Sequence, residues 1–151
     1  MTIIEKDLRM LEHAQLLQQA VKTVVPGVAE TVLIKESGPS IELAMGIIIG
    51  ITGSFSGKLV LTGLETTFQG ISEMMYGMRL EGAMLESFAG EIGNMIGGHF
   101  SIELSKNNIP IDITAPTILQ GSARISGYRS GILIKTLFMN NSQIEVYFLH
   151  D

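Results

Sequence analysis

The sequence predicts an α+β domain in which helices pack on an antiparallel sheet. Helical periodicity covers residues 5–25, 65–77 and 81–105, and the segments between and after them alternate as strands do. Helices and strands of this kind bury their apolar faces against each other in layers. No linker or low-complexity stretch divides the chain, and 151 residues suit a sizeable core, so residues 1–151 are expected to form a single domain.

The composition excludes several classes of function. Hydrophobic residues make up 46% and charged residues 17%, and the net charge is −5. Basic residues are few and scattered, so neither nucleic acid nor a membrane surface is an expected partner. The chain has no cysteine, which excludes disulfides, thiolate metal sites and cysteine nucleophiles. No stretch reads as a signal peptide or a membrane span, so a cytoplasmic location is expected.

The first half of the chain is expected to form a helix followed by an antiparallel meander. Apolar residues recur at helical spacing over residues 5–25, and Pro26 with Gly27 then stops the helix. The segments VAETVLIKES and SIELAMGIII alternate as strands, with Val32 and Ile34 on one face of the first. The turn residues GITGSFSG lead into a further strand, KLVLTG.

The second half is expected to hold two helices and then strands. A short helix over residues 65–77 precedes the longest one, over residues 81–105. The segment NNIPIDITAPTIL is extended, because its prolines interrupt regular structure. Two strands, SGILIKTLFM and QIEVYFLHD, close the chain around a turn at Asn140-Asn141. These strands are long and apolar, and an unpaired edge of this kind invites a second chain, which favours a homodimer.

The long helix contains an unusual concentration of glycine. In GEIGNMIGG, Gly90 to Gly98, four of nine residues are glycine, and each costs about 1 kcal/mol relative to alanine inside a helix. At 100° per residue, one side carries the apolar residues Leu85, Phe88, Ile92, Met95 and Ile96. A narrow edge beside it carries Gly90, Gly93 and Gly97. We expect this edge to pack closely against a neighbouring element, for which the 65–77 helix is a candidate.

The opposite side of the long helix is a line of short polar residues. It consists of Ser87, Glu91, Asn94, Gly98, Ser101 and Ser105. Solvated helix faces usually carry long side chains that favour helix, whereas Ser and Asn are mediocre helix formers. The line is therefore either an ordinary solvated face or a recognition surface that presents Glu91 and Asn94. Gly98 would keep that surface flat beside Asn94 and allow a bulky partner to dock.

The segment SFAGEIGNMIGG resembles the signature of the CheC/CheX/FliY family of chemotaxis phosphatases. In that signature Asp or Ser precedes a Glu by four residues and Asn follows the Glu by three, positions that Ser87, Glu91 and Asn94 fill. The family pattern also has a proline a little over twenty residues later, and Pro116 follows Asn94 at about that spacing. The segment IDITAPTILQG is similar to the stretch that follows this helix in CheX members.

The helix predicted over residues 65–77 indicates which subgroup of the family the chain resembles. CheC-like members carry two such motifs, but in LETTFQGISEMMYG the best alignment puts Glu73 three residues before Tyr76, with no asparagine. A single motif in each chain is the pattern of CheX members, which are homodimers. The resemblance therefore implies a CheC-like fold and, most closely, the CheX type.

The resemblance also implies a reaction and a partner. The family removes the phosphoryl group from a phosphorylated CheY-type response regulator. Asn94 would orient the attacking water, Glu91 would anchor on the regulator's active-site lysine, and Ser87 and Gly98 would contact the partner. No cofactor of the chain's own is expected, because the regulator carries the Mg²⁺. A catalytically silent dimeric module that binds the regulator through the same helix remains the alternative.

A metal enzyme is a weaker alternative. His99 and Glu103 are spaced i, i+4, but they lie on or beside the apolar side of the helix, and no second ligand cluster accompanies them. A partly buried, satisfied histidine is the expected role of His99. His13 and His150 lie near the termini without supporting residues, so no metal site is expected.

Overall fold

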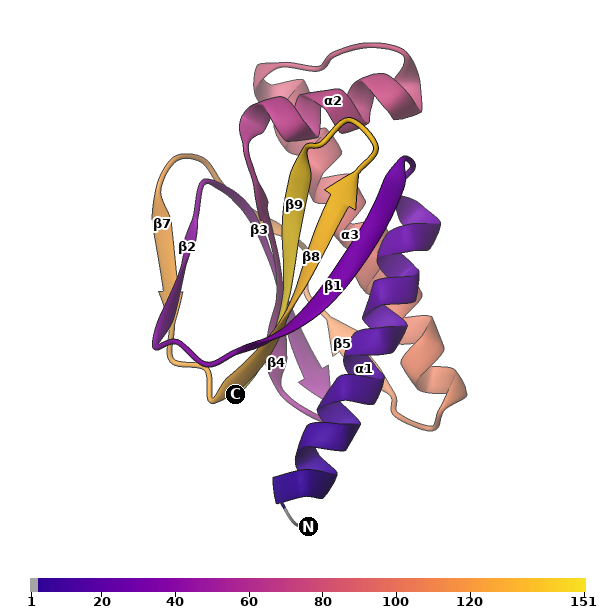
Figure 1. The fold of residues 1–151 in the computed structure, drawn as a ribbon, viewed down its shortest axis with the longest axis vertical. Helices are drawn as coiled ribbons and strands as arrows, with labels where there is room; N and C mark the ends of the chain where they lie inside the picture. The colour runs from indigo at the N-terminus through magenta and orange to yellow at the C-terminus, as the bar shows by residue number, and fades with distance from the viewer. Residues whose placement is uncertain (1–2) are drawn as a thin grey trace.

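Two of the three helices lie along one face of a central antiparallel sheet, the third lies across one end of it, and a small two-stranded sheet lies over the other face (Figure 1). The computed structural model describes residues 3–151. The helices are α1 (Ile3–Val24), α2 (Glu65–Tyr76) and α3 (Gly82–Lys106). The strands are β1 (Val28–Glu36), β2 (Ser40–Leu43), β3 (Met45–Gly53), β4 (Gly57–Gly63), β5 (Ile111–Ile113), β6 (Thr117–Leu119), β7 (Ala123–Ser126), β8 (Ser130–Phe138) and β9 (Gln143–His150). The predicted α+β fold is confirmed, although β7 was not expected.

The strands do not pair in chain order. Over the described residues the large sheet has the order β1-β8-β9-β4-β3-β5, with β6 also beside β3. The expected meander of the first half is therefore wrong, because β1 lies at an edge and pairs with β8. Within that meander the β3–β4 hairpin follows the prediction, and the predicted C-terminal hairpin of β8 and β9 is also present.

The segment SIELAMGIII is two strands rather than one. Leu43 packs in a small buried cluster beneath the β2–β7 sheet, whereas Met45 packs in the main core beneath the helices. The buried side therefore changes at Ala44, whose backbone N–H donates to Thr62 Oγ1 at 3.2 Å. Alternation of apolar residues continues through this switch, which is why the sequence pattern concealed the break.

The two C-terminal strands lie inside the sheet. β8 pairs with β1 and β9, and β9 pairs with β8 and β4. The expectation that these strands have unpaired edges is wrong. Their apolar runs reflect burial on both faces: Val146 and Phe148 belong to the main core, and Tyr147 and Leu149 belong to the small cluster on the other side.

The glycine edge of α3 packs against the sheet and not against α2. A Cβ built on Gly93 would lie 2.8 Å from Cγ2 of Ile47 on β3, and one built on Gly90 would lie 3.0 Å from Cδ1 of Ile118 on β6. The predicted close packing is confirmed, while the suggested neighbour, the 65–77 helix, is wrong. Because glycine has no side chain, α3 can lie close to the sheet. The apolar surface buried by this close packing offsets the low helix propensity of glycine.

No helix in residues 3–151 has both the length and the apolar character needed to cross a membrane.

Candidate functional site

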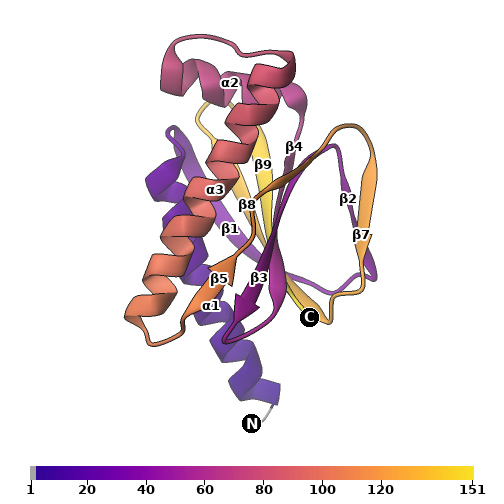
Figure 2. The ribbon, with the colours of Figure 1, turned by 180° about the vertical axis from the view of Figure 1, so that it is seen from behind.

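The polar line of α3 lies on the outside of the molecule. α3 runs along the outer surface, in front of the sheet in the view of Figure 2. Ser87, Glu91 and Asn94 are exposed, and Gly98 is partly exposed with open space where its Cβ would lie. The arrangement expected from helical angles is therefore present, with a flat surface one turn beyond Asn94.

The motif side chains have no internal partners. Among the side chains that the structure describes, none forms a hydrogen bond or ion pair with Ser87, Glu91 or Asn94. A carboxylate accepts hydrogen bonds only, whereas a carboxamide both donates and accepts. The line thus presents one anion and one bifunctional amide, on adjacent turns, to whatever docks on it.

The segment between β5 and β6 borders one side of this line. A Cβ built on Gly90, the residue before Glu91, would lie 3.7 Å from Cγ of Pro116. Gln120, which directly follows β6, donates from Nε2 to Glu86 Oε1 at 3.1 Å and ties the end of β6 to α3. The downstream proline of the sequence signature therefore lies against the helix at the level of the motif.

Exposed apolar residues border the other side of the line. Met84 is 63%, Met95 36% and Ile102 56% exposed. The assignment of Met95 to the buried side of α3 is wrong. Viewed down the axis of α3, Met95 lies about 80° from Ser87, at the edge of the buried face of the helix. Phe88, about 20° further round, is instead covered by Tyr76 of α2, with ring centroids 5.6 Å apart.

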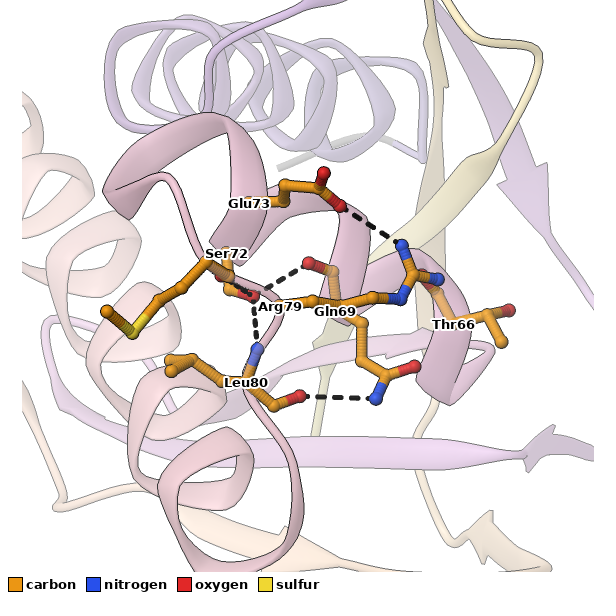
Figure 3. Close-up of polar contacts among 7 residues, drawn as sticks. Thr66, Gln69, Ser72, Glu73, Arg79 and Leu80 are labelled. Atoms are coloured by element: carbon orange, nitrogen blue, oxygen red, sulfur yellow. Dashed lines mark hydrogen bonds and ion pairs between the residues drawn. The ribbon is translucent and has the colours of Figure 1, made fainter.

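A buried hydroxyl fixes the connection that leads into α3 (Figure 3). Ser72 is fully buried, and its Oγ accepts from the backbone N–H of Leu80 at 3.1 Å. The same hydroxyl lies 2.7 Å from the carbonyl oxygen of Gln69 and 3.1 Å from that of Met78, either of which can accept its proton. Gln69 Nε2 donates to the carbonyl of Leu80 at 3.2 Å. These bonds set where α3 begins, and therefore how its motif is presented.

The motif-like residues of α2 contact neighbouring segments of the same chain. Glu73 pairs with Arg79 at 3.3 Å, and both side chains are about half exposed, so the pair contributes little stability. Tyr76 packs edge-on against Phe88. The helix that lacks the asparagine thus uses the equivalent positions for contacts with the loop and with α3.

The structure places the histidines differently from the sequence interpretation. His99 is exposed, so the expected partial burial is wrong, and Glu103 pairs with Lys106 at 3.1 Å. Among the side chains that the structure describes, no group of three or more His, Asp or Glu is placed to hold a metal ion.

His13 and His150, expected to be unsupported, share an aromatic cluster. His13 stacks on Phe55 with centroids 5.3 Å apart, and Phe55 stacks on His150 at 5.1 Å. His13 is 9% exposed and its Nδ1 has no hydrogen-bond partner. Burial, and then the nearby His150, lower the pKa of His13. Its helical spacing from Met10 and Leu17, which face the same core, was the signal that could have revealed its burial.

Comparison with known proteins agrees with this fold. The family model described as "Chemotaxis phosphatase CheX" matches residues 45–134, which make up more than half of the chain and include the whole motif segment. The chain therefore belongs to this family.

Individual relatives span different shares of the chain. The CheY-P phosphatase CheX of Thermotoga maritima is 34% identical over 92 residues, and the match covers 58% of this chain and 58% of that protein. The crystal structure of a CheX protein from Desulfovibrio desulfuricans has a TM-score of 0.79 at 19% identity, over 93% of this chain and 99% of that one. A CheX–CheY–BeF3–Mg²⁺ complex from Borrelia burgdorferi has a TM-score of 0.76 at 18% identity, over 92% and 98% of the two chains.

Proposed function

We propose that this protein dephosphorylates a CheY-type response regulator by docking on it through α3. The observation that carries the proposal is the presentation of Glu91 and Asn94 on one exposed helix face without internal partners. Membership of the CheX family and the name of the Thermotoga maritima relative, CheY-P phosphatase, support the same reaction.

Asn94 is the catalytic residue in this proposal. The substrate is an acyl phosphate on aspartate, so hydrolysis forms a bond from water oxygen to phosphorus and breaks the bond from phosphorus to the carboxylate oxygen. The Asn94 carboxamide accepts a hydrogen bond from that water and donates one to a nearby oxygen, so it orients the water without taking its proton, as Gln does in Ras-type GTPases. Positioning of this kind is worth about 2–4 kcal/mol, or roughly 10²–10³ in rate.

Glu91 is the anchor. A second anion close to the phosphoryl group is repelled, so Glu91 is a poor general base. Three residues before Asn94, it is placed to pair with the lysine of the regulator's active site, and Ser87 lies one turn before it. The chain needs no cofactor of its own under this proposal, since Mg²⁺ belongs to the regulator. The Borrelia burgdorferi complex pairs a CheX with CheY in the presence of BeF3 and Mg²⁺, which supports a CheY-type protein as the partner.

Steady-state phosphate release from a CheY-type regulator, phosphorylated with acetyl phosphate, tests the two roles. Asn94→Ala is expected to lower kcat about 10²-fold with little change in KM. Glu91→Ala is expected to weaken docking by about 1.5–3 kcal/mol and so to raise KM roughly ten- to hundredfold. Ser105→Ala, at the far end of the same polar line, is the matched control. If both motif variants have wild-type kinetics, the phosphatase proposal is wrong and a catalytically silent module that binds the regulator is the better description.

We also propose that the protein is a homodimer that pairs through β1. This nine-residue strand ends the described sheet and pairs there with β8 alone. Val32 and Ile34 on it are 37% and 43% exposed, so the edge offers both backbone groups and apolar surface. Sedimentation is expected to show a dimer at micromolar concentration and a monomer for Ile34→Lys. A wild-type monomer would contradict this assembly.

We propose that the protein is cytoplasmic, and the absence of cysteine is compatible with that location.

A further inference from the structure

Two exposed methionines lie in line with the anchoring carboxylate on α3. Met84 precedes Glu91 by seven residues and Met95 follows it by four. At 100° and 1.5 Å per residue, the three lie within about 40° of one another, roughly 10 Å and 6 Å apart along the axis. Met84 is 63% exposed and Met95 36%. The carboxylate of Glu91 is therefore flanked along the helix by apolar side chains.

On the opposite border of the polar line, the residues beside Gly90 are also apolar. Pro116 lies against α3 at Gly90, next to Ile118, whose Cδ1 would lie 3.0 Å from a Cβ at that glycine. Glu91 and Asn94 thus lie on a narrow polar strip between two apolar borders. Interfaces whose central charged groups are surrounded by contacts that exclude water have this organisation.

We infer that Met84 and Met95 are specificity-determining contacts for the phosphorylated receiver domain, and that they exclude water from the ion pair of Glu91. The inference rests on the proposed function and deepens it. The occupant is a receiver domain with a lysine at its active site and an apolar rim around it. An ion pair left in water contributes almost nothing to binding, whereas one that is desolvated and hydrogen-bonded is substantially stronger. Methionine suits this role because its flexible, polarisable side chain adapts to a partner's surface.

The first test compares KM and kcat for Met84→Gln and Met95→Gln. Glutamine has nearly the helix propensity of methionine, so folding is expected to be unchanged. Each variant is expected to raise KM about five- to tenfold on the regulator that the wild-type chain dephosphorylates, with kcat within twofold. Met139→Gln, at a position that is 77% exposed in the β8–β9 turn, is the matched control with wild-type kinetics.

The second test asks whether the methionines act through Glu91. In the Met84→Gln/Met95→Gln background, Glu91→Gln is expected to raise KM by a several-fold smaller factor than in the wild type, because the ion pair is already hydrated. KM of the double-methionine variant is also expected to rise more steeply with salt. An unchanged KM in both single variants, or an equal effect of Glu91→Gln in both backgrounds, would overturn the inference. A wild-type rate for Asn94→Ala would instead overturn the proposed function itself.

Discussion

Alanine at two glycines of α3 is expected to have opposite effects on stability. Both Gly93 and Gly98 lie inside the helix, so alanine gains about 1 kcal/mol of helix propensity at either position. At Gly98 the new methyl group meets nothing within 4 Å. At Gly93 it would lie 2.8 Å from Cγ2 of Ile47, a fully buried side chain of the sheet, and 3.4 Å from Cδ1 of Ile49.

The propensity gain is common to both variants, so their difference isolates the cost of overpacking. Extra methyl groups in a well-packed core cost about 1–3 kcal/mol, because the β-branched neighbours must leave their rotamers or the helix must move. Gly98→Ala is therefore expected to be about 1 kcal/mol more stable than the wild type. Gly93→Ala is expected to be about 1–3 kcal/mol less stable than Gly98→Ala.

Thermal unfolding followed by circular dichroism measures this difference. For a chain of this size it corresponds to a gap in Tm of roughly 2–12 °C between the two variants. The same Gly98→Ala protein should bind the regulator more weakly, since the methyl group projects from the surface that the partner is proposed to cover. Equal Tm values for the two variants would refute the account of the glycine edge as a close contact with β3.

Two other features of the structure give further predictions. Ser72→Ala removes the acceptor of the Leu80 N–H in a fully buried site. The free energy of unfolding, measured by urea titration, is therefore expected to fall by about 1–3 kcal/mol. A fall of less than about 0.5 kcal/mol would show that this hydrogen bond is dispensable. Burial and the nearby His150 lower the pKa of His13 in the folded protein, and Glu12 opposes them. As the pH falls below about 6.5, the His13 imidazole is therefore protonated in the unfolded chain before it is protonated in the folded one. The free energy of unfolding is expected to decrease over that pH range. His13→Gln should lose that part of the pH dependence, and an equal loss of stability between pH 7.5 and pH 5.5 in both proteins would contradict it.

Local patterns gave most elements of the fold but not their order. The three helices and the β3–β4 hairpin follow from periodicity and turn residues close together in the sequence. The pairing of β1 with β8 joins segments about a hundred residues apart, and no local pattern encodes it. The break between β2 and β3 at Ala44 could not be predicted either. The apolar residues before and after Ala44 alternate as in one strand, although they pack in two different clusters.

The candidate site was more predictable than the fold around it. Ser87, Glu91 and Asn94 lie on one helix, so their common face follows from 100° per residue without any tertiary information. The neighbours that border this face come from elsewhere in the chain. Pro116 is brought to Gly90 by the β5–β6 segment, and Tyr76 at the end of α2 contacts Phe88, while Met95 is exposed. Helical angle alone therefore predicts which residues share a face, but not what covers the margins of that face.

The central claim is that Asn94 acts on the reaction and not on the binding of the regulator. Single-turnover release of phosphate, with the Asn94→Ala protein saturating over the phosphorylated regulator, tests it most directly. Affinity for the same regulator carrying beryllofluoride in place of the phosphoryl group is measured in parallel. The account predicts a rate about 10²-fold below wild type with an affinity within a few-fold. A wild-type rate, or a slow rate explained entirely by lost affinity, would contradict it.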